Sequence, residues 1–249
     1  FGVQIYAEFS NGFMEIPFVL MLTSAIGVVL LPMYSKMSHE NVDTEEFVLV
    51  WRTVLEKSTA IIYPLVIFFL FHAELIVVLL YSESYINSAL YFQICMMVNF
   101  FTIIIFSPLL LALGKTRFYA QLHMVMAILA WILGYLVVVV FNSPVAVAIL
   151  SVTLAIIKVM AAFFFTAKFL GVSLSRLIPF KTITLFAVHS IITMMIIQQS
   201  FSFAGYTADS LLGLVVTALI YGMLLIGTSF LFRLDYLLAL KDLLMKQRG

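Results

Sequence analysis

Four polar side chains recur near the N-terminus at helical spacing: Gln4, Glu8, Asn11 and Glu15. At 100° per residue they fall within an arc of about 60° on one helix face, just before the apolar run FVLMLTSAIGVVLL. Carboxylates and amides in such a stripe can bind hydroxyl groups or carry a proton or a sodium ion. Gln4 and Glu8 are equally compatible with a place at the outer bilayer interface, whereas Glu15 lies about two turns deeper and favours a functional role.

Lys158 is the one basic residue that lies away from the charged connections, roughly 10 residues from the inner end of an apolar run. Ser151, Ala155 and Ala162 share its helix face, which predicts a narrow groove of small residues around it. An ammonium group is a good counter-charge for phosphate, so Lys158 is a candidate for binding an anionic substrate. Snorkelling to the inner headgroups, or a structural ion pair with an acid, explains the residue equally well.

The remaining reactive side chains form no recognisable catalytic or metal-binding pattern. His72, His123 and His189 lack metal-ligand spacing, and no cysteine or acid pair completes a set with them. We expect them to be hydrogen-bonded within the protein. The single cysteine, Cys95, lies in an apolar run, and the sequence contains no glycine-rich phosphate loop. We therefore expect no metal, no cofactor and no enzymatic reaction.

The composition identifies the environment of these side chains. Hydrophobic residues make up 64% of the chain, charged residues make up 10%, and the mean hydropathy is +1.18. Such a chain cannot cover the surface of a soluble domain. Because backbone polar groups cannot remain unpaired in hydrocarbon, the long apolar runs predict helices, and the fold class is an all-α integral membrane protein. The net charge of +1, without a dense basic run, excludes nucleic acid as a partner.

The apolar runs divide into segments of the length that a bilayer requires, which is about 20 residues. We predict about seven transmembrane helices, in the ranges 6–33, 54–80, 86–112, 118–141, 144–167, 182–201 and 210–232. Twelve of the 13 Lys and Arg residues fall in alternate connections and in the tail. By the positive-inside rule these segments are cytoplasmic, so the first helix runs from outside to inside and the C-terminus is cytoplasmic.

The connection after the first span carries a helix-start pattern. Asp43 and Glu46 resemble a capping box, and apolar residues follow at helical spacing. We expect an interfacial helix that leads into the second span, with Trp51 at headgroup depth and Arg52 and Lys57 near anionic lipid.

Three further patterns predict irregularities. Pro64 and Pro108 lie inside predicted spans and should kink them. The second span is expected to break near residues 72–74. The tail LDYLLALKDLL is amphipathic and is expected to lie on the inner membrane surface.

Several motifs occur in an order and register that match a known family. The stretch FGVQIYAEFSNGFMEIP is followed by VVLLPMYSKM, then by AELIVVLLYSESYINSALYFQI and SPLLLALGKTRFY. The matching positions are Gly2, Tyr6, Ala7, Pro17, Leu31, Pro32, Ser35, Tyr85, Ala89, Gln93, Ile94, Leu113, Gly114, Lys115 and Tyr119. Over residues 1–180 the chain resembles the second half of the polysaccharide flippases, the O-antigen and exopolysaccharide branch of the multidrug/oligosaccharidyl-lipid/polysaccharide exporter superfamily.

The resemblance implies a two-lobe transporter of 12–14 helices around a central cavity. This chain would supply helices 8–14: residues 1–180 as the C-terminal lobe, and residues 181–249 as two additional helices with a cytoplasmic tail. The first lobe would come from a preceding segment or from a second chain. The helix that carries Gln4, Glu8, Asn11 and Glu15 would line the cavity.

The implied function is to flip a lipid-linked oligosaccharide of the undecaprenyl-pyrophosphate type from the inner to the outer leaflet, for polysaccharide or O-antigen biosynthesis. The implied location is a bacterial or archaeal cytoplasmic membrane. Glu15, with Asn11, would bind sugar hydroxyls or carry a coupling proton or sodium ion, and Lys158 would face the pyrophosphate.

Four alternatives remain at this point. Within the superfamily they are a peptidoglycan-precursor flippase and a multidrug or cation antiporter. Outside it are a membrane glycan polymerase or ligase and a non-transporting assembly partner. The polymerase or ligase is disfavoured, because the predicted outer connections are short and lack Arg, Lys and His.

Overall fold

The computed structural model describes residues 1–205, 209–232, 234 and 236, and these form helices and turns without a strand. Six helices in this part of the chain are long and apolar enough to cross a membrane. They are α2 (Pro17–His39), α3 (Thr44–Phe71), α7 (Thr116–Phe141), α8 (Pro144–Leu170), α10 (Phe180–Ala204) and α11 (Leu211–Phe232). The chain is therefore an all-α, multi-pass integral membrane protein, as its composition predicts.

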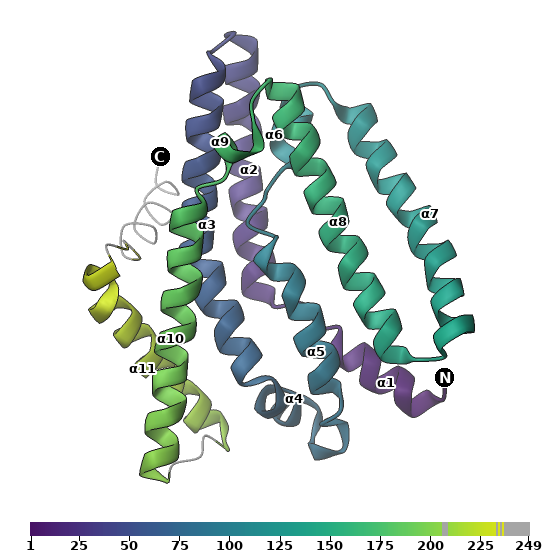
Figure 1. Cartoon of the computed structure of the whole chain (residues 1–249), viewed down its shortest axis with the longest axis vertical. Helices are drawn as coiled ribbons and strands as arrows, with labels where there is room; N and C mark the ends of the chain where they lie inside the picture. The colour runs from purple at the N-terminus through teal and green to yellow at the C-terminus, as the bar shows by residue number, and fades with distance from the viewer. Residues whose placement is uncertain (206–208, 233, 235, 237–249) are drawn as a thin grey trace.

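Shorter helices lie between and beside these spans. They are α1 (Val3–Gly12), α4 (Ala73–Tyr81), the 3₁₀ turn η1 (Glu83–Tyr85), α5 (Ser88–Met96), the 3₁₀ turn η2 (Met97–Phe100), α6 (Ser107–Ala112) and α9 (Leu174–Leu177). α1 and α4 lie at one end of the bundle, and α9 lies toward the other end (Figure 1).

The first predicted span, 6–33, is not one continuous helix. α1 ends at Gly12, and α2 begins at Pro17. Proline disfavours helical backbone at the residue before it and cannot donate an amide hydrogen bond, so it begins α2 instead of continuing α1. The prediction that Gln4, Glu8, Asn11 and Glu15 share one helix is consequently wrong for Glu15, which lies in the break.

The third predicted span, 86–112, is also discontinuous. α5 and η2 end at Phe100, and α6 begins only at Ser107. Pro108 sits in the first turn of α6, where a missing amide hydrogen costs little, and does not kink a continuous helix. The described residues thus contain six continuous spans and one broken segment, compared with the prediction of about seven transmembrane helices. The predicted break near residues 72–74 is confirmed, because α3 ends at Phe71 and α4 starts at Ala73.

α3 begins where the sequence predicts, but not for the predicted reason. Asp43 occupies the N-cap position and its side chain makes no capping hydrogen bond. Glu45 and Glu46 in the first turn still favour a helix start through the helix dipole. Trp51 does not face lipid headgroups: it is 2% exposed and stacks on Phe163 of α8, with ring centroids 6.1 Å apart.

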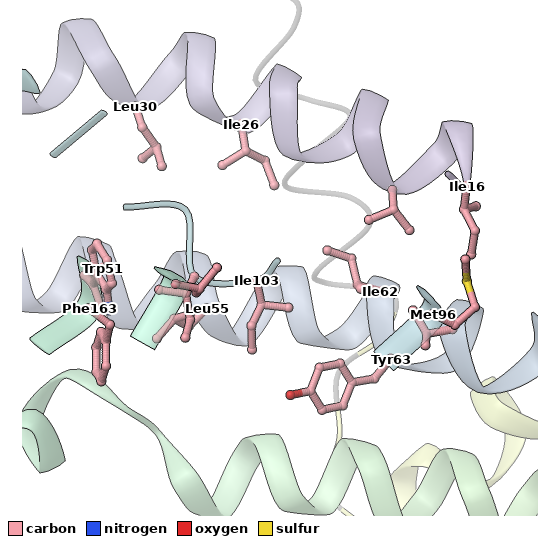
Figure 2. Packing of buried hydrophobic residues seen from close by; sticks show 14 of the residues in the cluster. Ile16, Ile26, Leu30, Trp51, Leu55, Ile62, Tyr63, Met96, Ile103 and Phe163 are labelled. Carbon is pink, nitrogen blue, oxygen red and sulfur yellow. The ribbon is translucent and has the colours of Figure 1, made fainter. Parts of the chain in front are cut away.

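The main core lies between α2, α3, α8 and the broken segment. Figure 2 shows Ile26 and Leu30 of α2 on one side and Leu55 of α3 on the other, with Ile103 of the broken segment among them. Ile103 is 3% exposed. Irregular backbone is tolerated at membrane depth when protein covers it, which is the situation of this segment.

α10 and α11 extend the bundle on the far side of α3. α10 packs along α3, and α11 packs on α10 (Figure 1). The hydroxyl of Tyr221 in α11 donates a hydrogen bond to the carbonyl oxygen of Ser190 in α10 at 3.2 Å. The predicted amphipathic tail, 234–244, lies outside the described residues except for Leu234 and Tyr236.

α7 has a different relation to the bundle. It lies at the edge, beside α8 (Figure 1). All of α7 belongs to the described residues, and of these only Leu122 is buried. Trp131 is 80% exposed. The hydrophobic surface of this helix therefore faces away from the protein described here.

The connections separate by charge at the two ends of the bundle. The α2–α3, α6–α7 and α8–α9 connections gather at one end, while α4–α5, α7–α8 and the end of α10 gather at the other (Figure 1). Arg176 of α9 forms an ion pair with Glu45, and Arg52 donates to the Arg176 carbonyl oxygen at 3.2 Å. The basic end therefore also ties α9 to the start of α3.

Candidate functional site

A cavity of about 590 Å³ opens beside Lys158. Its walls come from α2, α6, α8 and the broken segment between η2 and α6. We call it the lysine cavity; its polar lining residues are Thr23, Ser24, Thr102, Ser107 and Lys158.

The broken segment positions one wall of the lysine cavity. Residues 104–106 line it together with Thr102, and Ser107 starts α6 there. In membrane transporters, unwound backbone within a discontinuous span is the typical location of substrate and ion sites. The sequence did not predict this wall, because the break falls within the apolar stretch FTIIIFSP.

α2 supplies the opposite wall from one of its faces. Thr23, Gly27 and Leu31 line the cavity at spacings of four, while Ile26 and Leu30 on the other face are buried in the core. The hydroxyl of Thr23 donates to the carbonyl oxygen of Val19 at 2.9 Å. This polar face was missed, although the Thr23 and Ser24 pair inside an apolar run is a signal that could have found it.

Lys158 is half-buried in α8. Within the part of the chain that the structure describes, its amino group forms no ion pair with a carboxylate. The structural ion pair considered for this residue is therefore not found among the described residues. A cation that lines a cavity beside hydroxyl groups, and that has no acid next to it, provides a place for an anion.

A second cavity, of about 720 Å³, lies at the end of the bundle that holds α1 and α4. We call it the outer cavity, because the positive-inside rule predicts that this end of the bundle faces outside. Its polar lining residues are Glu8, Glu74, Asn87, Tyr91 and Gln93. Glu8 is 7% exposed. The amide nitrogens of Gln4 and Asn87 both donate to its Oε1, each at 3.3 Å.

Close packing between α1 and α5 places Glu8 beside Asn87. The ring of Phe9 packs against Tyr91, with centroids 5.4 Å apart. Gly12 lies so close to α5 that a Cβ atom there would be 2.4 Å from the Cβ of Tyr91. The structure thus brings Gln4 and Glu8 together, as their spacing predicts. It adds Asn87, which is 79 positions from Glu8 in the sequence, so no local pattern could predict this contact.

Asn11 and Glu15 line neither cavity. Asn11 is half-buried at the end of α1, and Glu15 is exposed in the break before α2. The predicted stripe is therefore divided between the outer cavity and the junction of α1 with α2.

The histidines are held individually. His72 Nδ1 bonds to the carbonyl oxygen of Phe68 at 2.9 Å, and both ring nitrogens of His189 pair with hydroxyl groups, those of Tyr236 and Thr228, at 2.8 Å. The prediction of hydrogen-bonded histidines is confirmed for these two. It is wrong for Nε2 of His123, which is buried without a partner.

A model of a known protein family matches part of the chain. Residues 5–90 match the model of a family described as polysaccharide biosynthesis protein. This confirms the resemblance to a polysaccharide flippase-type family, and the matched range includes Glu8, Glu74 and Asn87 of the outer cavity. No curated protein and no solved structure matches the chain significantly. The match indicates a role in polysaccharide biosynthesis or export.

Proposed function

We propose that this chain is part of a transporter that flips a lipid-linked oligosaccharide, of the undecaprenyl-pyrophosphate type, from the inner to the outer leaflet. The observation that carries the proposal is the lysine cavity, in which Lys158 faces a broken transmembrane segment. The family match at residues 5–90 supplies the polysaccharide context.

The lysine cavity has the chemistry that a pyrophosphate requires. The ammonium of Lys158 is a compact positive charge, and the hydroxyls of Ser24 and Ser107 are donors that form no hydrogen bond with the described residues. The low local dielectric strengthens such contacts. Val28, Leu31 and Ile105 complete the lining with apolar surface, so the cavity suits an anionic group attached to a lipid.

The alternatives fit this geometry less well. A transporter of organic cations would place a carboxylate in a cavity beside its spans. The charge in the lysine cavity is positive, and the carboxylates of Glu8 and Glu74 line the separate outer cavity at the end of the bundle. Asn11 and Glu15 lie at the junction between α1 and α2. Their proposed role is to bind sugar or to carry a proton or sodium ion at that junction. We retain it as part of the transport cycle.

The test is flipping of a fluorescent lipid-linked oligosaccharide in proteoliposomes that contain the full-length protein. Label that reaches the outer leaflet is destroyed by dithionite, which gives the rate. Lys158→Met should lower the rate at least about tenfold, because a charge-assisted hydrogen bond is worth about 1.5–3 kcal/mol. Lys158→Arg should retain part of it.

Lys181→Met is the matched control. Lys181 is exposed in the first turn of α10 and lines neither cavity, so its substitution should leave the rate unchanged. Wild-type flipping by the Lys158→Met protein would refute the proposal.

A further inference from the structure

The outer cavity has the size and position of a separate ligand site. It lies between α1, α4, α5 and the start of α8, at the end of the bundle away from the basic connections (Figure 1). Its volume of about 720 Å³ falls within the range of about 300–1,000 Å³ that small-molecule sites occupy. Its residues differ from those of the lysine cavity, so the two can bind different groups.

Glu8 is the central group of this cavity. Its side chain is 7% exposed, and both amide donors, from Gln4 and Asn87, bond to the same oxygen, Oε1. In the described residues the other oxygen, Oε2, accepts no hydrogen bond. Oε2 is not one of the fully buried polar atoms without a partner, so it is accessible from the cavity, and a ligand there can donate a hydrogen bond to it.

The other polar groups determine which donor fits. Glu74, Asn87 and Gln93 add a carboxylate and two amides, and no Lys, Arg or His of the described residues lines the cavity. Two carboxylates without a cation repel an anionic ligand. Ile5, Ile86, Leu90 and Pro144 provide apolar surface next to these groups.

A neutral sugar matches this lining. Its hydroxyls donate to carboxylates, its oxygens accept from amides, and its C–H faces contact apolar side chains. A bound metal ion matches less well, because no group of three or more His, Cys, Asp or Glu in the described residues could hold one. We propose that the outer cavity binds a neutral sugar residue through its hydroxyl groups and rejects acidic sugars. The inference rests on the proposed function for the source of the sugar, but binding itself requires no transport.

The test is saturation-transfer NMR on the purified full-length protein in detergent. The probes are maltotriose and chitotriose, which are neutral, and tri-galacturonate, which is acidic. Wild-type protein should transfer saturation to a neutral probe and not to tri-galacturonate. Glu8→Gln should weaken neutral binding about tenfold and also reduce the discrimination against tri-galacturonate, which a purely structural role would not do.

Two further variants keep the test decisive. Glu74→Gln changes an exposed lining residue and should weaken neutral binding without unfolding α1, even if Glu8→Gln is unstable. Glu83→Gln, in η1 at the same end but outside the cavity, should change nothing.

Three results would overturn the inference. They are no saturation transfer to either neutral probe, equal binding by the wild-type and both lining variants, or binding of tri-galacturonate as strong as that of a neutral probe. Thermal stabilisation by sodium or calcium that depends on Glu8, without sugar binding, would assign the cavity to a cation. The flipping rate of Lys158→Met is independent of all of these, so failure of the proposed function is distinguishable from failure of this inference.

Discussion

Gly12 offers a direct test of how α1 is held against α5. In Gly12→Ala the new Cβ would lie 2.4 Å from the Cβ of Tyr91 and 2.6 Å from the carbonyl oxygen of Ser88. Both atoms are fixed to the α5 backbone and cannot rotate away. Ordinary van der Waals contact begins at 3.4 Å, so the helices must separate by about 1 Å.

The expected cost can be estimated from two opposing effects. Overpacking at a close contact costs about 1–3 kcal/mol, while replacing glycine by alanine in a helix returns up to about 1 kcal/mol. We expect a net loss of about 1–2 kcal/mol, concentrated in α1. Separation also lengthens the 3.3 Å hydrogen bond between Asn87 and Glu8 and opens the outer cavity.

Hydrogen–deuterium exchange combined with thermal unfolding in detergent measures both effects. Gly12→Ala should speed exchange in α1 and lower the midpoint of thermal unfolding. Gly134→Ala in α7 is the matched control, since nothing lies within 4 Å of its Cβ position, and it should be neutral or stabilising. Unchanged exchange in α1 of Gly12→Ala would show that α1 does not pack on α5 as described.

Two further predictions concern residues outside the cavities. In single-tryptophan variants, lipids with brominated chains should quench the fluorescence of Trp131, which is 80% exposed. The fluorescence of Trp51, which is 2% exposed, should remain unquenched. Equal quenching of the two would contradict the packing of α3 on α8. His189→Ala should lower the free energy of unfolding by about 2–3 kcal/mol, because it removes the partner of both the Tyr236 and the Thr228 hydroxyl groups. Thr228→Val should cost less, since His189 then keeps its hydrogen bond to Tyr236; equal effects in thermal unfolding would refute this ranking.

The sequence predicts the continuous spans well, because their signal is the length of an apolar run. The predicted span 118–141 agrees closely with α7, which covers Thr116–Phe141. The predicted span 144–167 likewise agrees with α8, which covers Pro144–Leu170. The same signal cannot detect a break whose residues remain apolar. Residues 101–106 interrupt a span without a change in hydropathy, and only their packing against α2 and α3 makes the irregular backbone tolerable.

The residues of the candidate sites were likewise predictable only in part. Lys158 and Glu8 were predicted because a charged residue in an apolar run is conspicuous. Their neighbours were not, because Asn87 reaches Glu8 from another helix, and Ser107 reaches the lysine cavity only through the break before α6. Such contacts depend on tertiary packing, which no local pattern encodes.

Apolar side chains meet different requirements in α7, which is mostly exposed, and in α3, which is mostly buried. In α3 an apolar side chain must fit its neighbours, so shape matters: Leu55 and Ile62 are almost completely enclosed. In α7 most side chains are exposed to the surroundings of the protein, apart from those such as Phe118 that pack against α8, so solubility in lipid is the main requirement at the exposed positions. Leu, Ile, Val and Phe should therefore replace one another with little effect at the exposed positions of α7, whereas the same exchanges should be disruptive at the buried positions of α3.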